Sequence, residues 1–349
     1  MLIAFFVNAM DDEYPRYTTT LLAHEASLRG HDVCYLTPGD FVMSPDDGML
    51  VHARMVPAAK TKTRTGEAFF KDLQSVDKAT LIKITDIDVL MLRNDPSNDA
   101  LERPWAEDAG IQFGRRAAQR GVLVLNDPAA LSQAMNKLYF QSFPREVRAE
   151  TLITRHASDI KKFAKKHNNK VVLKPLQGSG GQGVFLVDSK SAANLNQMIE
   201  AIGRDGYIIA QTYVPEADKG DIRLFLMNGV PLGVDGKYAA MRRVSSKDDI
   251  RSNIHAGGKA KAVKITEREL RVAELIRPKL IKDGMFLVGI DIIGDTILEV
   301  NVFSPGNLHS CTDMTGVNFA AMIIAAIERK VEIAAEFPGH FDNRTLAVM

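Results

Sequence analysis

The chain has 349 residues, enough for two or three packed domains with a sizeable core. Apolar residues make up 46% and charged residues 25%, which excludes a disordered, collagen-like or coiled-coil chain. The 44 lysines and arginines nearly balance 43 acidic residues, so no overall charge favours nucleic acid or an anionic membrane, and any anion site must be local.

The cysteines and the apolar segments bear on where the chain works. Cys34 and Cys311 are too few for a disulfide framework or a thiolate metal cluster, and we expect two small core residues in a reducing compartment. No basic residue precedes the apolar run 2–7 and three acidic residues follow at 11–13, unlike a signal peptide. The longest later apolar run, 319–327, is too short to span a membrane. A cytoplasmic protein is expected.

The first 125 residues alternate short apolar runs with amphipathic stretches, the pattern of β-α-β units around a parallel sheet. Gly30 is placed to end the first helix in a left-handed conformation. The expected strands are 2–7, 33–36, 89–92 and 122–125, and the expected helices are 18–29 and 114–120.

Arg93 follows the strand 89–92, at the carboxyl end of which an open α/β sheet places its ligands. It is a candidate anion contact, and an exposed loop arginine is the alternative. Asn126-Asp-Pro128 then begins another helix, with a cap and a proline in the first turn.

Beyond residue 150, strands joined by glycine-containing loops replace the first pattern. Asn228-Gly229 is a turn signal between strands. Residues 237–258, which contain glycines and arginines, are expected to be mobile. The expected strands are 171–176, 184–187, 207–214 and 223–227, with a hairpin at 286–301, and the expected helices are 154–166, 191–202, 266–281 and 317–333.

The segment Gly178-Ser-Gly-Gly-Gln-Gly183 matches the dinucleotide-binding pattern GxGxxG, but its context does not. That fingerprint needs a helix after the loop, and a strand, 184–187, follows here. A glycine loop between antiparallel strands can instead fold its backbone amides over phosphates. Lys174, on the entering strand, adds a positive charge. An ordinary glycine-rich hairpin is the alternative.

The hairpin 286–301 is unusual because charged groups interrupt core-like strands. Glu299 and Asn301 share one face of a strand, and a three-residue loop at 294–296 would place Asp291 opposite Glu299. Two such carboxylates repel unless one is protonated or a cation lies between them. Oxygen ligands favour a hard cation such as Mg²⁺, shared with nucleotide phosphates. A polar strand edge is the alternative.

Several arginines lie between the glycine loop and the hairpin, with Asn253 and Gly257-Gly258 among them. Arginine binds carboxylate or phosphate through paired donors, although a solvated charge run would look similar. His255 and His309 could contact a substrate or be structural. The arginines are Arg223, Arg242, Arg243 and Arg251.

Together these segments resemble the ATP-grasp ligases, and most closely the bacterial glutathione synthetases, to about residue 333. The resemblance rests on Val171-Val-Leu-Lys-Pro-Leu-Gln-Gly-Ser-Gly-Gly, Gln211-Thr-Tyr-Val-Pro, Lys219-Gly-Asp-Ile-Arg223, Arg251-Ser-Asn253 with Ala256-Gly-Gly258, and Phe286-Leu-Val-Gly-Ile-Asp-Ile-Ile-Gly-Asp followed by Glu299-Val-Asn301. Asn136-Lys137 resembles the family's ATP-contacting lysine helix.

The resemblance implies an α/β protein with the ATP-grasp fold: an N-terminal parallel-sheet substrate domain (1–125), a lid (126–213) and a catalytic domain (214–349). It implies three catalytic residues, Arg223, Arg251 and Asn253, and three ligands, Asp291, Glu299 and Asn301, for two Mg²⁺ ions, with Mn²⁺ as the other candidate metal. It implies ATP contacts from Lys137, Lys174, Gly178, Gly180, Gly181, Gln211, Tyr213, Val214 and Asp221, and substrate contacts from Arg93, Arg243, Gly257, Gly258, Ser304 and His309.

The implied reaction phosphorylates the C-terminal carboxylate of γ-glutamylcysteine with ATP, after which the amine of glycine attacks the acyl phosphate. The partners would be an acidic peptide and an amino acid, in a homo-oligomer, with no nucleic acid or membrane. Gly306 and His309 depart from the family pattern after Ser-Pro305. They motivate one alternative, a related ligase for another acid and amine. The second is a nucleotide-binding protein without turnover.

Overall fold

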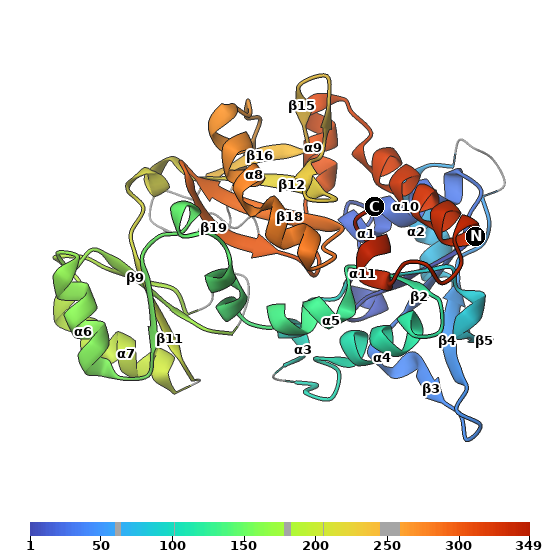
Figure 1. Ribbon diagram of the computed structural model, residues 1–349, viewed down its shortest axis with the longest axis horizontal. Helices are drawn as coiled ribbons and strands as arrows, with labels where there is room; N and C mark the ends of the chain where they lie inside the picture. Colours follow the sequence, from blue (N-terminus) through green and yellow to red (C-terminus); the bar gives the residue numbers. More distant parts are fainter. Residues whose placement is uncertain (60–63, 101, 178–182, 205, 245–258) are drawn as a thin grey trace.

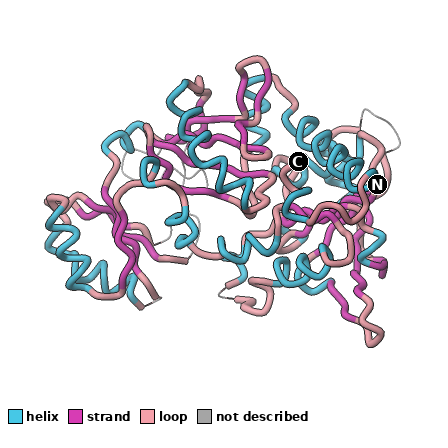
Figure 2. Tube along the Cα trace, in the orientation of Figure 1, coloured by secondary structure: helices cyan, strands magenta, loops and turns pink. Residues whose placement is uncertain are grey.

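The computed structural model describes residues 1–59, 64–100, 102–177, 183–204, 206–244 and 259–349. The described chain forms three main β-sheets that follow one another in the sequence (Figure 1). The lid lies at one end of the elongated molecule and the N-terminal sheet at the other, with the third sheet between them (Figure 1). Figure 2 shows the same arrangement by secondary structure.

The N-terminal sheet has the strand order β3-β4-β2-β1-β6-β7, with β5 paired to β4. Its centre is parallel, as predicted, because β1 pairs in parallel with β2 and β6, and β6 with β7. The antiparallel strands β3, β4 and β5 lie in the polar segment for which no strand was predicted. The strands are β1 (Leu2–Phe6), β2 (Asp32–Leu36), β3 (Phe41–Met43), β4 (Met49–Met55), β5 (Thr80–Lys83), β6 (Val89–Leu92) and β7 (Leu123–Leu125).

Helices cover this sheet, and one of them comes from the far end of the chain. The first helix ends as predicted, with Gly30 at φ +88°. Helix α10 packs against α1, and residues of both share a core with β1. The helices of the N-terminal part are α1 (Thr18–Leu28), α2 (Gly66–Gln74), α3 (Pro96–Asp99), α4 (Ala109–Ala118) and α5 (Pro128–Leu131).

The lid is a four-stranded antiparallel sheet, β10-β9-β11-β8, with its own hydrophobic core. The strands on either side of the glycine loop pair in antiparallel fashion, as predicted, although residues 178–182 lie outside the described chain. The helix predicted from Thr154 begins only at Ala157, because Thr154 ends strand β8. The elements are β8 (Thr151–Thr154), α6 (Ala157–Lys166), β9 (Val171–Pro175), β10 (Phe185–Val187), α7 (Leu195–Gly203) and β11 (Ile208–Thr212).

The third sheet has the order β17-β16-β12-β18-β19, with β13 paired to β12 and a separate small hairpin, β14-β15. The expectation of a mobile segment from residue 237 is wrong as far as residue 244, because β15 and β16 lie there; 245–258 lie outside the described chain. The strands are β12 (Asp221–Met227), β13 (Val230–Pro231), β14 (Gly233–Val234), β15 (Lys237–Tyr238), β16 (Ala240–Val244), β17 (Lys259–Lys261), β18 (Leu287–Ile293) and β19 (Thr296–Asn301).

The last helices are α8 (Glu267–Lys282), α9 (Leu308–Thr315), α10 (Phe319–Glu336) and α11 (Asn343–Leu346). Helix α8 begins with a capping box between Thr266 and Glu269, close to its predicted start. Helix α9 was not predicted. It buries only two residues, Leu308 and Cys311, so its sequence shows little of the apolar periodicity that indicates a helix.

The predicted hairpin is present, with a different turn. Ile293 pairs with Thr296, so the loop has two residues, Gly294 and Asp295, and not three. A β-bulge between Asp291 and Ile292 shifts the register by one residue. Asp291 therefore still lies opposite Glu299, as predicted.

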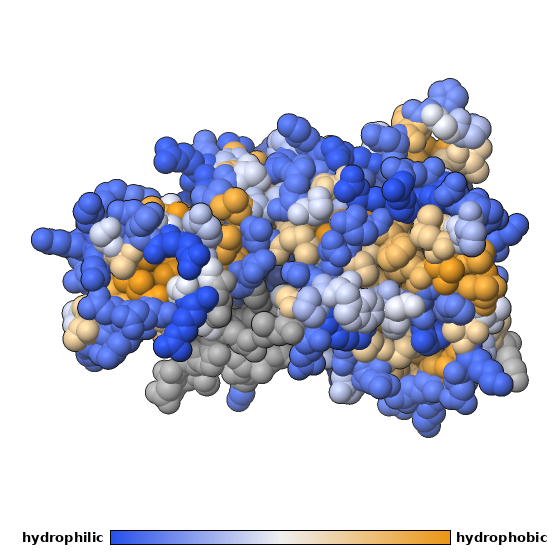
Figure 3. All heavy atoms as spheres, turned by 90° about the horizontal axis from the view of Figure 1, so that it is seen from below, coloured by the Kyte–Doolittle hydropathy of each residue, from blue (hydrophilic) through white to orange (hydrophobic). Residues whose placement is uncertain are grey.

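The surface, the cysteines and the long helices can be compared with what the composition predicts. The face in Figure 3 is mostly hydrophilic, with apolar side chains exposed in separate places. Both cysteines are buried and free, as predicted. Among the described residues, no single helix is long and apolar enough to cross a membrane; α9 and α10 meet that test only as a pair, bent by 119°.

Candidate active site

Four neighbouring strands of the third sheet place charged side chains in register. Asp221 on β12 lies opposite Arg243 on β16, and Arg223 on β12 lies opposite Asp291 on β18. Residues that face each other across an antiparallel ladder project from the same side of the sheet. Asp291 also faces Glu299 on β19, so this row of charged residues ends in two neighbouring carboxylates.

Asp291 is the centre of this network. Arg223 Nη2 donates to Asp291 Oδ2 at 2.9 Å, and Arg243 Nη2 lies 2.7 Å from the same oxygen. Arg243 also binds Asp221 through Nε at 2.9 Å. Burial alone raises the pKa of Asp291, but the two arginines outweigh it and hold the pKa below its usual value. Asp291 is therefore an ionised carboxylate, although it is only 1% exposed.

The predicted metal ligands are brought together by the hairpin. Asn301 Nδ2 donates to Asp291 Oδ2 at 3.3 Å, and Glu299 lies beside this pair on the same strand face. No group of three or more His, Cys, Asp or Glu side chains with metal-binding geometry occurs within the described ranges. The donor set nevertheless fits Mg²⁺, which commonly takes one or two carboxylates and completes its shell with water and phosphate oxygens.

Two lysines from different elements lie near Glu299. Lys174 is on β9, and Lys137 begins the short helix η5 (Lys137–Ser142). Burial lowers the pKa of Lys174 to about 8, with Glu299 acting in the opposite direction and Lys137 in the same one. Burial also lowers the pKa of Lys137, against the opposing effect of Glu299. The site thus combines a carboxylate with two lysines whose pKa values are lowered by burial.

The lid holds Lys174 through the side chain of Gln211, which is one of the predicted ATP contacts. Lys174 Nζ donates to Gln211 Oε1 at 3.1 Å, and Gln211 Nε2 donates to Thr151 Oγ1 at 3.0 Å. The next predicted nucleotide contacts, Tyr213 and Val214, follow at the end of β11.

Seven predicted site residues lie outside the described chain, and their roles remain predictions. They are Gly178, Gly180, Gly181, Arg251, Asn253, Gly257 and Gly258.

Arg93 is not the exposed loop arginine of the alternative interpretation. It is 6% exposed, and burial lowers its pKa to about 10. Its Nε donates to Thr19 Oγ1 at 3.2 Å, and its Nη2 donates to the carbonyl of Pro305 at 3.0 Å. Arg93 therefore joins the N-terminal sheet to the segment that follows β19.

Two other predicted substrate residues, Ser304 and His309, lie in or beside that segment. His309 is in the first turn of α9, and the backbone of Leu308 donates to Thr18 Oγ1 at 3.2 Å. Burial and the nearby Arg16 lower the pKa of His309. Its Nδ1 atom has no hydrogen-bond partner among the described residues. Arg93 thus contacts the segment after β19 that contains Ser304 and leads into the helix of His309, whereas Arg243 belongs to the Asp291 network.

Asn126 is a positioning residue that the sequence reasoning missed. Its side chain pairs with Leu287, accepting from the backbone nitrogen at 2.9 Å and donating to the carbonyl at 3.1 Å. It thereby holds the start of β18 against the end of β7. The sequence Asn126-Asp-Pro128 gave only a helix-cap signal, because pairing with a strand 161 residues away leaves no local pattern.

Comparison with protein families gives two adjoining matches. Residues 1–132 match the model of the prokaryotic glutathione synthetase N-terminal domain, and residues 136–316 match that of the prokaryotic glutathione synthetase ATP-grasp domain. The glutathione synthetase of Brucella melitensis is 34% identical over 90% of this chain and 93% of its own. That of Vibrio parahaemolyticus is 31% identical over 88% and 91%.

Solved structures of lower identity show the fold. A D-cycloserine synthetase superimposes with a TM-score of 0.62 at 13% identity, over 95% of this chain and all of that one. A RimK-domain ATP-grasp protein from Sphaerobacter thermophilus gives 0.55 at 15% identity, over 92% and 98%. The expected ATP-grasp fold is confirmed.

The Arg243→Met variant tests the buried network. It leaves Asp221 and Asp291 short of a counter-charge, so the free energy of unfolding in urea should fall by about 3–5 kcal/mol at pH 7. The deficit should shrink below about pH 4, because Asp291 stabilises the fold only while ionised and protonation removes the need for a partner.

Arg242→Met is the matched control, since Arg242 alternates with Arg243 on β16 and has a side-chain contact of 3.4 Å with the Lys219 carbonyl. It should cost less than about 1 kcal/mol. Equal losses in both variants would contradict the network's role.

Proposed function

Because the chain belongs to the prokaryotic glutathione synthetase family, we propose that it is an ATP-dependent ligase that joins γ-glutamylcysteine to glycine. ATP would phosphorylate the dipeptide's C-terminal carboxylate and leave as ADP. The glycine nitrogen would then attack the acyl carbon, lose a proton and expel phosphate. The observation that supports this most directly is the convergence of Lys137, Lys174 and Glu299 beside Asp291.

The protein's part in such a reaction is to position charges. Lys137 and Lys174 would bind the nucleotide phosphates, because they are cations held close together in a partly buried site. Gln211 orients Lys174 through its amide oxygen. Closure of the lid over the nucleotide would exclude water, which otherwise hydrolyses an acyl phosphate.

Glu299, Asn301 and Asp291 would hold Mg²⁺ with the nucleotide, and we propose two ions, as in the sequence-based prediction. Bound there, Mg²⁺ would neutralise phosphate charge. Glu299 offers the carboxylate that is not bonded to an arginine in the described structure, whereas Asp291 already serves Arg223 and Arg243. The arginines fix the orientation of Asp291 and keep it ionised before any ion arrives.

The acid and the amine would bind where the N-terminal sheet meets the segment after β19. Arg93 supplies a buried guanidinium there, and His309 Nδ1 is a polar atom without a partner among the described residues. An acidic peptide needs cationic or donor groups at each carboxylate. Arg223 lies between this region and Asp291, since its side chain packs beside Gly289 and Pro305 is next to the same glycine.

We further propose a cytoplasmic homo-oligomer with the three domains given above. The proposal of an oligomer rests on the family resemblance alone, and most homo-oligomers assemble through symmetric contacts. The structure gives the domain proposal its support, because the three sheets occupy separate stretches of chain and the lid has a separate core.

ADP release with γ-glutamylcysteine plus glycine, compared with a panel of other acids and amines, tests the reaction. Turnover only with another pair would favour the related ligase that Gly306 and His309 suggest. No turnover with any pair, together with tight binding of Mg-ATP, would favour a nucleotide-binding protein.

The double variant Glu299→Gln, Asn301→Ala should lower kcat about a hundredfold or more, because it removes the negative charge of Glu299 and the amide oxygen of Asn301 from the proposed metal site. Asp295→Asn, at the exposed tip of the same hairpin, is the control and should be close to wild type. Steady-state rates at several Mg²⁺ concentrations provide the measurement. Near-normal activity of the double variant would sink the metal assignment.

Lys174 should make nucleotide binding depend on pH. With a pKa of about 8 in the free protein, Lys174 loses its charge as the pH rises through that value. Affinity for Mg-ATP should therefore fall between about pH 7 and 9. Lys174→Arg should remove this fall, because arginine stays protonated. The control variant Lys161→Arg, on the exposed face of α6, should keep the fall in affinity. Calorimetric titration of Mg-ATP at several pH values provides the measurement.

His309→Ala should raise the KM for the acid or the amine about tenfold and leave the KM for ATP unchanged, because one donor or acceptor toward a polar substrate is lost. Steady-state kinetics with each substrate varied in turn gives the answer. Unchanged constants for all three substrates would make His309 a structural residue of α9.

A further inference from the structure

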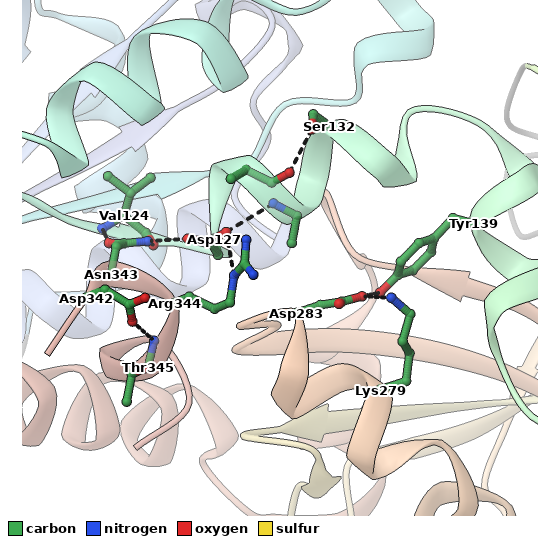
Figure 4. Close-up of polar contacts among 12 residues, drawn as sticks. Val124, Asp127, Ser132, Tyr139, Lys279, Asp283, Asp342, Asn343, Arg344 and Thr345 are labelled. Carbon is green, nitrogen blue, oxygen red and sulfur yellow. Dashed lines mark hydrogen bonds and ion pairs between the residues drawn. The ribbon is translucent and has the colours of Figure 1, made fainter.

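Residues 126–142 connect the N-terminal sheet to the lid and carry Lys137. Both ends of this connection are held by one turn, Asp283-Gly284, at the C-terminus of α8. Figure 4 shows the two groups of contacts, one around Asp127 and one around Asp283. The proposed ATP site does not explain these contacts, since none of them involves a residue assigned to it.

At the first end, Asp127 is fixed in three directions. Its backbone nitrogen donates to the Gly284 carbonyl at 3.1 Å, and its Oδ1 accepts from Ala130 at 3.0 Å, which caps α5. Its Oδ2 accepts from Asn343 Nδ2 at 3.0 Å. Asn343 also pairs with both backbone groups of Val124, at 2.7 and 3.0 Å, and so extends the edge of β7.

At the second end, Tyr139 is fixed by a buried charge. Its hydroxyl donates to Asp283 Oδ2 at 2.7 Å, and Lys279 Nζ donates to the same oxygen at 2.6 Å. Lys279 also lies over the Tyr139 ring, 5.1 Å from its centre. Burial and the bond to Asp283 raise the pKa of Tyr139, so the phenol remains a donor. These atoms meet in Figure 4 between α8 and the connection.

Gly284 lets the turn approach this closely. Its φ is +63°, and a Cβ there would lie 2.8 Å from Asp127 Cβ and 2.9 Å from the Arg344 carbonyl oxygen. Three residues later, the same stretch of chain enters β18, which carries Asp291. The turn therefore joins one rigid strand to both ends of the connection.

We propose that the Asp283-Gly284 turn positions Lys137 for the nucleotide, with Tyr139 and Asp283 as the positioning residues; this rests on the ATP site proposed above. Tyr139 is two residues from Lys137, and the backbone of Lys137 donates to the Leu176 carbonyl of the lid at 3.0 Å. Holding Tyr139 to α8 sets Lys137 at a fixed place relative to Asp291 and Glu299. The chain after residue 336 contributes by holding Asp127 through Asn343.

The test is a double-mutant cycle between Tyr139→Phe and Lys137→Ala, read as the Kd for Mg-ATP by calorimetry of the full chain. Tyr139→Phe removes one hydroxyl and should weaken binding about tenfold, because it frees the lysine without removing it. In the Lys137→Ala background the same change should have no further effect. Effects that multiply, or no effect of either single variant, would overturn the proposal.

Two further variants separate positioning from folding. Asp283→Asn keeps an acceptor for Tyr139 and should bind Mg-ATP more tightly than Asp283→Ala. Arg271→Ala breaks an exposed pair with Glu274 on the same helix and should leave the Kd unchanged. A purely structural role would lower the fraction of competent protein, and so the stoichiometry, at an unchanged Kd; that result would also overturn the proposal.

Asn343→Ala repeats the test at the Asp127 end of the connection, and should likewise weaken Mg-ATP binding only when Lys137 is present.

Binding of Mg-ATP can be measured without the acid or the amine, so this test does not depend on which substrates the enzyme joins. Failure of the ligase assignment would appear as absent ADP release with γ-glutamylcysteine and glycine while this cycle still gives its expected coupling.

Discussion

An ionised carboxylate buried in a sheet needs counter-charges, and Asp291 sets that requirement for the centre of this protein. Arg223 and Arg243 meet it from two strands, and Asp221 in turn orients Arg243. Arg243 and Arg223 converge on Asp291 because β16, β12 and β18 are neighbours in the sheet. The strand order of the third sheet therefore also determines the charges around the proposed metal site.

Hydrogen bonds connect the N-terminal part of the chain to β18 and to the segment after β19, and so bring it next to the Asp291 network. The side chain of Asn126 pairs with the backbone of Leu287, the first residue of β18, and so ties the N-terminal sheet to the strand that carries Asp291. Arg93 reaches the Pro305 carbonyl, which ties the same sheet to the segment after β19. Arg93, the proposed substrate contact of the N-terminal part, is thus held in place relative to the Asp291 network.

The sequence predicted the elements whose pattern is local, and it missed those that depend on distant partners. The apolar hairpin 286–301 was found, and Asp291 faces Glu299 even though the assumed loop was one residue too long, because a bulge restores the register. The strands at 237–244 were taken for part of a mobile segment, because the stretch 237–258 contains several arginines and ends in two glycines. The pairing of β16 with β12 and the contacts of α9 with β15 and β16 leave no local pattern in the sequence. Neither Asn343 nor Tyr139 carries a motif, because the residues that each contacts lie far away in the chain.

The two lysines of the site are supported in different ways, and this bears on how the lid can act. Lys174 belongs to the lid, whose core includes no described residue from the rest of the chain, so the lid can move as a unit without opening another core. Lys137 is bonded to the lid at Leu176 and, through Tyr139 and Asp283, to the catalytic body. A movement of the lid would therefore change the distance from Lys174 to Glu299 more than that from Lys137. In the ATP site proposed above, Lys137 would then hold the nucleotide while the lid is open, and Lys174 would approach it when the lid closes.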